Sequence, residues 1–208
     1  MRILAIECAT EACSVALFEG GEAIAHDHRV LGRGHAERLV PMIAGLPERG
    51  RAERILVSLG PGSFTGVRIG IATARALGYA WGAEVAGYPT LALVAAVVRA
   101  GRPGEPLAVC TTGGHGEWFV QQFGGDGTAL DEARSLTPQQ AAAVLDAPLV
   151  GGTQAEALVA LRGTGEAIAR HPDARHALDI PGAELCRDVR PVYGRPPDAT
   201  PAAPGGPA

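Results

Sequence analysis

A glycine-rich segment, Gly60 to Gly70 (GPGSFTGVRIG), most constrains what this chain can fold into. The apolar stretch 54–59 before it predicts a short buried strand, and the residues that follow, up to Trp81, have helical spacing. Each glycine inside a helix costs about 1 kcal/mol relative to alanine, so a compensating contact is expected. Small residues recur at every fourth position of this helix, at Gly66, Gly70, Ala74 and Gly78. They form a stripe nearly free of side chains, and we expect another backbone to pack against it.

The spacing of this turn excludes two common phosphate-binding motifs. A P-loop needs a lysine after its second glycine, and the chain contains no lysine. A dinucleotide-binding fingerprint needs a third glycine where Thr65 stands. Two interpretations remain open. Gly60, Gly62 and Ser63 present backbone N–H groups and a helix N-terminus to an anion, or they form a tight turn before a closely packed helix with Ser63 as its cap.

Several segments together resemble one known family. They are 3–17, 35–43, 60–70, 74–78, 87–91 and 191–199. These segments are similar to TsaB (older name YeaZ), a family of bacterial subunits needed for threonylcarbamoyl-adenosine (t6A) modification of tRNA. The match covers about the first hundred residues well and the second half only in patches. The quoted segments are long, which makes the resemblance specific.

The order of predicted elements indicates an α/β fold with a repeated theme. Strands at 2–8, 12–18 and 22–28 are followed by an amphipathic helix that Pro41 is expected to kink or end, and a helix is expected near 90–99. After a Gly/Pro-rich boundary at 101–106, strands at 107–111 and 117–123 precede a helix capped by Thr137.

The resemblance implies two ribonuclease-H-like lobes of the actin, hexokinase and sugar-kinase (ASKHA) type, with the second lobe reduced. The first lobe is expected at 1–100 with partner-docking helices, and the second, smaller lobe at 104–195. The proline-, glycine- and alanine-rich segment 196–208 is expected to be a flexible tail.

Composition narrows the class of partner and compartment. With 18 basic and 22 acidic residues the net charge is −4, so the chain lacks the positive field of an autonomous nucleic-acid binder. No apolar run approaches the roughly 18 residues of a membrane helix, and the chain begins directly with a strand, which predicts a cytoplasmic protein.

The four cysteines, Cys8, Cys13, Cys110 and Cys186, lack metal-binding spacing and are interpreted as reduced core thiols, although Cys8 and Cys13 could face each other across a hairpin. Neither they nor the six histidines predict a metal site.

The resemblance also shows where this chain departs from active members of the superfamily. Glu7 stands where the family usually carries Asp, and Cys8-Ala9 replaces Thr-Ser, although Thr10 remains. In the second lobe the segment 112–114 (TGG) replaces the usual Asp-Ala-Arg. Glu117 is either a residual site group or an exposed strand-edge glutamate. We therefore expect no catalytic residues, and only Glu7, Thr10, Gly60, Gly62 and Ser63 as candidate cofactor-binding groups.

Two hypotheses follow. The first is a non-catalytic scaffold that binds its catalytic paralogue TsaD, with a TsaE-like ATPase as a further partner, a homodimer when isolated, and tRNA held only through the complex. It requires no cofactor of its own, and ATP or ADP would sit at the partner interface. The second is a self-sufficient small ATPase, kinase or glycoprotease-like peptidase of the same fold.

Arg68 and Arg75, seven residues apart, either pair with partner groups or form a solvated face. The predicted partner interface comprises Leu39, Ile43, Gly66, Arg68, Gly70, Ala74, Arg75 and Gly78.

Overall fold

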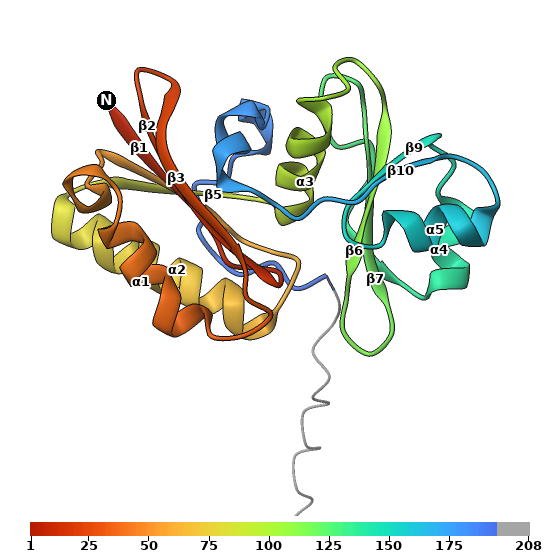
Figure 1. The fold of residues 1–208 in the computed structure, drawn as a ribbon, viewed down its shortest axis with the longest axis horizontal. Coiled ribbons are helices and arrows are strands. Elements are labelled where there is room, and N and C mark those ends of the chain that lie inside the picture. Colours follow the sequence, from red (N-terminus) through yellow and green to blue (C-terminus); the bar gives the residue numbers. More distant parts are fainter. Residues whose placement is uncertain (195–208) are drawn as a thin grey trace, which may run out of the picture.

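The computed structural model describes residues 1–194 and contains two five-stranded sheets that lie side by side (Figure 1). The first sheet has the order β3-β2-β1-β4-β5, and the second has the order β10-β9-β6-β7-β8. The strands of the first sheet are β1 (Arg2–Glu7), β2 (Ala12–Glu19), β3 (Glu22–Val30), β4 (Arg54–Ser58) and β5 (Glu84–Tyr88). Those of the second are β6 (Leu107–Thr112), β7 (Trp118–Phe123), β8 (Arg134–Leu136), β9 (Leu149–Gly151) and β10 (Glu166–Ile168).

Both sheets have one topology, which confirms the predicted duplication. In the first sheet β1 pairs antiparallel with β2 and parallel with β4. In the second, β6 pairs antiparallel with β7 and parallel with β9. Two ribonuclease-H-like α/β lobes result, and the second is the smaller because β8, β9 and β10 have three residues each.

The helices separate the molecule into layers. Helices α1 (His35–Ala44) and α2 (Phe64–Trp81) cover the outer face of the first sheet, while α4 (Pro138–Val144) and α5 (Ala155–Arg162) cover the outer face of the second (Figure 1). Helix α3 (Thr90–Arg99) lies between the sheets, where eight of its ten residues are buried. A helix that is apolar on all sides requires such a central position. None of the helices within residues 1–194 has the length and apolar character needed to span a membrane.

Local signals in the sequence account for the starts of two helices, α2 and α4. Ser63 caps α2 by accepting a hydrogen bond from the Gly66 N–H at 3.2 Å, and Thr137 forms a capping box with Gln140 at the start of α4, both as predicted. The expectation that Pro41 ends the first helix early is wrong, because α1 continues through Pro41 to Ala44. Contacts of the buried α1 residues with the sheet offset the lost hydrogen bond.

The chain returns to the first lobe after β10. Two short 3-10 helices, η2 (Ala174–Asp179) and η3 (Gly182–Glu184), lead to a bridge between Cys186 and Gly87 of β5. The Val192 N–H then donates to the Leu59 carbonyl at 2.7 Å. The segment predicted as the second lobe therefore ends on the first sheet. The predicted flexible tail, 196–208, lies outside the described residues.

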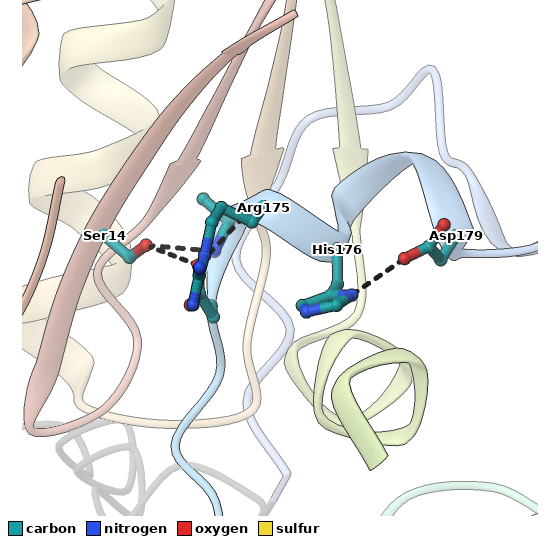
Figure 2. A network of polar contacts seen from close by, with 6 residues as sticks. Ser14, Arg175, His176 and Asp179 are labelled. Carbon is teal, nitrogen blue, oxygen red and sulfur yellow. Dashed lines mark hydrogen bonds and ion pairs between the residues drawn. The ribbon is translucent and has the colours of Figure 1, made fainter. Parts of the chain in front are cut away.

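A polar network fixes the start of this return (Figure 2). The Ser14 hydroxyl on β2 donates to Asp173 at 3.4 Å and accepts from the Ala174 N–H at 3.0 Å. Arg175 holds the same carboxylate, with its Nη2 2.6 Å from Asp173 Oδ2. Burial raises the pKa of Asp173, but the hydrogen bonds and charge of Arg175 outweigh burial and hold that pKa below its usual range.

Candidate functional site

Four of the five predicted cofactor-binding residues, Glu7, Thr10, Gly62 and Ser63, lie around the backbone of Ala9, at the carboxyl end of β1. Gly60 lies elsewhere, since a Cβ there would be 2.6 Å from the Val192 carbonyl oxygen. Glu7 accepts a hydrogen bond from the Ala9 N–H, and the Ser63 N–H donates to the Ala9 carbonyl at 2.6 Å. Gly62 lies so close that a Cβ there would be 2.0 Å from the same carbonyl, which is why glycine is required. Thr10 accepts from the Ala12 N–H at 3.2 Å. The fold therefore brings these four residues together, but this protein's own backbone occupies several of the groups that an anion would use.

Glu7 is the most perturbed acid of this site. Its side chain is completely buried, and its Oε2 atom has no hydrogen-bond partner. Burial raises the pKa of Glu7 to about 7, although hydrogen bonds from Ala9 and Ser58 act in the opposite direction. At neutral pH the carboxyl group is therefore protonated in about half of the molecules. Burial therefore favours the neutral form of the Glu7 carboxyl in the protein on its own.

The corresponding hairpin of the second lobe joins β6 to β7. Glu117, directly before β7, is half-buried and accepts a 2.6 Å hydrogen bond from the Ser135 hydroxyl. It is therefore not the exposed strand-edge glutamate considered above. Thr112 at the end of β6 bonds to Thr153 and to Gln154, at 3.2 Å and 2.9 Å between side-chain atoms. Hydroxyl and amide groups of this chain thus pair with one another at this edge.

The small-residue stripe of α2 does not face a partner, which corrects the prediction for these residues. The stripe faces the first sheet, so the backbone that packs against it belongs to this same chain. A Cβ at Gly66 would be 2.0 Å from the Cys8 carbonyl oxygen, and one at Gly78 would be 2.4 Å from the Val85 side chain. The stripe residues Gly66, Gly70, Ala74 and Gly78 are all buried.

Leu39 and Ile43 of α1 are also wrongly assigned to the partner interface. Both are buried in the core between α1, α2 and the first sheet. The amphipathic pattern correctly identifies the apolar face of α1, but this face packs on the protein's own sheet. Burial of a leucine or isoleucine side chain contributes about 1.5–3 kcal/mol, so these residues stabilise the lobe itself.

Arg68 and Arg75 are exposed, and both contact the returning C-terminal segment. The Arg75 guanidinium donates to the Val189 carbonyl at 2.7 Å. Arg68 donates to the Tyr193 hydroxyl at 3.0 Å and stacks on the Phe64 ring, with 3.6 Å between its Cζ atom and the ring centroid. The Phe64 and Tyr193 rings are stacked 5.4 Å apart. The arginines therefore join the glycine-rich turn to the late segment that shares the family resemblance.

The structure adds three exposed apolar side chains on α1 and α2 that the sequence analysis missed. Phe64 and Tyr79 of α2 are 55% and 94% exposed, and Val40 of α1 is 54% exposed. The signal was present in the spacing, since positions 64, 68, 75 and 79 share the helix side opposite the small-residue stripe. We call Val40, Phe64, Arg68, Arg75 and Tyr79 the outer helix face.

The cysteines behave as expected except for one. Cys8, Cys13 and Cys110 are buried and free, but Cys186 is exposed and is therefore not a core thiol. The Cys8 and Cys13 sulfur atoms lie 3.6 Å apart. Across residues 1–194, no three His, Cys, Asp or Glu side chains are arranged so that they could hold a metal ion.

Comparisons with known proteins agree with the predicted resemblance. The family model for TsaD, tRNA N6-adenosine threonylcarbamoyltransferase, matches residues 28–183. The tRNA threonylcarbamoyladenosine biosynthesis protein TsaB of Escherichia coli is 49% identical over 90 residues, which are 41% of this chain and 38% of that protein. An uncharacterised protein of Mycobacterium tuberculosis is 30% identical over 97% of this chain and 95% of its own length.

Solved structures support the same assignment. YeaZ from Pseudomonas aeruginosa superposes with a TM-score of 0.75 at 29% identity, and the match covers 92% of this chain and 99% of that one. The likeness therefore includes both lobes, whereas the E. coli alignment spans only about two fifths of that relative. The chain belongs to the TsaD family of tRNA N6-adenosine threonylcarbamoyltransferases and, within it, to the TsaB (YeaZ) group.

Proposed function

We propose that this chain is a non-catalytic subunit of t6A biosynthesis that binds and supports a TsaD-like paralogue. Family membership supports the pathway, because relatives of this group are named as threonylcarbamoyladenosine biosynthesis proteins. The observation that carries the scaffold role is the outer helix face, a row of exposed aromatic, aliphatic and arginine side chains on helices whose opposite side is already packed. TsaE-like ATPase and tRNA would join through the complex, in the cytoplasm.

The composition of the outer helix face suits a protein partner. Aromatic residues and arginine are enriched at protein interfaces and dominate their binding energy. Tyr79 projects almost its whole ring into solvent, and Phe64 is held by Arg68 rather than buried. A partner helix laid along α1 and α2 would cover these rings and Val40 together. In the absence of TsaD, a second copy of this chain would use the same face.

The chemistry of the two hairpins supports a role without turnover. The Ala9 and Ser63 N–H groups already donate to groups of this chain, which leaves fewer backbone donors for a phosphate at this edge. The net charge of −4 argues that tRNA is bound by another subunit. ATP or ADP would then bind at the interface with the partner.

The test is co-expression with the TsaD-like protein of the same organism, followed by pull-down. Tyr79→Asp is expected to abolish capture and to leave Tm unchanged, because the side chain is 94% exposed. Leu161→Asp on α5 is the matched control, since Leu161 is 51% exposed on the other lobe, and it should bind as the wild type does. Nucleoside analysis of tRNA from a strain depleted of its TsaB protein should show t6A restored by the wild type and the control only.

Two results would contradict the proposal. Equal capture of TsaD by wild type and Tyr79→Asp would exclude the outer helix face as the docking surface. Magnesium-dependent ATP hydrolysis by the purified chain, lost on Glu7→Ala, would favour the self-sufficient enzyme instead.

A further inference from the structure

Two buried thiols face each other beneath the first turn of the chain. Cys8 follows β1, Cys13 belongs to β2, and their sulfur atoms are 3.6 Å apart. The antiparallel register ends with Glu7 opposite Ser14, so one further step places Cys8 opposite Cys13. Directly opposed residues in such a ladder have Cα atoms about 4.5–5.5 Å apart, within the roughly 4.4–6.8 Å that a disulfide spans. Both side chains lie on the helix-covered face of the sheet.

We propose that Cys8 and Cys13 form a reversible redox site, which hydrogen peroxide converts from two thiols to an intramolecular disulfide. The Cys13 thiolate attacks peroxide, the O–O bond breaks, and the departing hydroxide takes up the proton that the Cys13 thiol released, which gives a sulfenic acid and one water. The Cys8 sulfur then attacks the Cys13 sulfur, the S–O bond breaks, and the departing hydroxide takes the Cys8 proton as a second water. The two sulfurs lose two electrons and two protons in total, and one peroxide is reduced to two waters.

The surroundings assign different roles to the two sulfurs. Either sulfur can donate in the contact between them; with Cys8 as the donor the pKa of the Cys13 thiol is lowered, which favours Cys13 as the attacking thiolate. The same contact, together with burial, raises the pKa of Cys8, which suits the resolving thiol. Forming a bond of about 2.05 Å requires the sulfurs to approach by roughly 1.5 Å, which side-chain rotation can supply.

The position of the turn between Cys8 and Cys13 determines how peroxide reaches the thiols and what their oxidation would change. Cys8 and Cys13 are buried, whereas Thr10 and Glu11 between them in the sequence are half-exposed, so oxidation by peroxide requires this short turn to open. The bond would tie together residues 8–13, including the Ala9 carbonyl to which the Ser63 N–H donates. Oxidation would therefore fix the hairpin on which the glycine-rich turn rests. This inference does not depend on the proposed partner.

The other two cysteines provide internal controls. Cys110 is buried, and burial raises the pKa of its thiol to about 12, so it should resist peroxide. Cys186 is exposed and should react whether or not the site exists.

The experiment uses the reduced full-length chain, treated with hydrogen peroxide and then alkylated with iodoacetamide after unfolding. The intact mass is expected to show the loss of two hydrogen atoms. Peptide mapping is expected to show that neither Cys8 nor Cys13 is alkylated, and dithiothreitol should reverse both changes. Cys186→Ser should form the same link, and Cys13→Ala should leave Cys8 open to alkylation. Full alkylation of Cys8 and Cys13 in the wild type, at a peroxide dose that oxidises Cys186, would overturn the proposal whatever the variants do.

Discussion

Replacing Glu7 with glutamine should make the protein more stable at neutral and alkaline pH. Glu7 is fully buried, and its folded-state pKa of about 7 compares with 4.5 for the free side chain. Each pH unit between these two values is worth about 1.4 kcal/mol, so the ionised carboxylate costs the folded state about 3 kcal/mol. Glutamine has nearly the same shape, accepts the Ala9 N–H and never ionises.

The pH range of the effect follows from the sign of the shift. At pH values well below 4.5 both the folded and the unfolded states are protonated, and Glu7 costs nothing. As pH rises from 4.5 to about 7, the unfolded state releases its proton first and the wild type loses stability. At pH values well above 7 both states are ionised, and the cost stays constant.

Urea denaturation of wild type and Glu7→Gln between about pH 5 and pH 8 measures this cost directly. The variant's advantage in unfolding free energy should grow through that range to about 3 kcal/mol. Glu22→Gln is the control, since Glu22 is exposed at the start of β3, and its free-energy difference should not change with pH. An equally flat difference for Glu7→Gln would refute the reasoning, because it would mean that water or a cation reaches the carboxylate.

Four further substitutions, at Gly66, Gly70, Leu39 and Arg75, test the packing of the first lobe. Gly66→Ala should lower Tm far more than Gly70→Ala. An added Cβ would lie 2.0 Å from a backbone carbonyl oxygen at Gly66, but 3.5 Å from its nearest contacts at Gly70. Equal Tm values for the two variants would contradict this packing. Leu39→Ala should cost about 2–5 kcal/mol in chemical denaturation, and a loss under about 1 kcal/mol would mean that α1 is loosely packed. Arg75→Met removes the bond to the Val189 carbonyl, so amide hydrogen exchange should accelerate in the segment 186–194 and not in β1, whereas unchanged exchange would show that other contacts hold the segment.

The sequence predicted elements well because their signals are local. The caps at Ser63 and Thr137 depend on residues three positions away, and the two lobes follow from strand and helix order.

The wrong assignment of Gly70 to a partner interface has a different cause. Spacing shows that one helix face is bare, but it does not show whether the surface opposite belongs to this chain or to another. A lobe must first cover its own sheet. The small-residue stripe of α2 and Leu39 of α1 therefore pack on the first sheet.

The contacts of the C-terminal segment could not have been predicted in the same way. Arg75 and Val189 are separated by 114 positions, and no periodicity connects them. The resemblance indicated that residues 191–199 matter, but only the folded chain shows that Tyr193 stacks on Phe64. By contrast, exposure of Tyr79 was within reach, because it lies opposite the stripe on the same helix.

The return of this segment also links completion of the N-terminal lobe to the last stage of translation. A ribosome synthesises β1 to β5 first, at about 5–20 residues per second, long before Cys186 and Val192 emerge. Until then β5 lacks its bridge to Cys186, and the Leu59 carbonyl lacks the Val192 N–H. Contacts across such a sequence separation form slowly, and an unpaired strand edge readily pairs with other chains. The nascent lobe therefore lacks both contacts until nearly the whole chain has been synthesised.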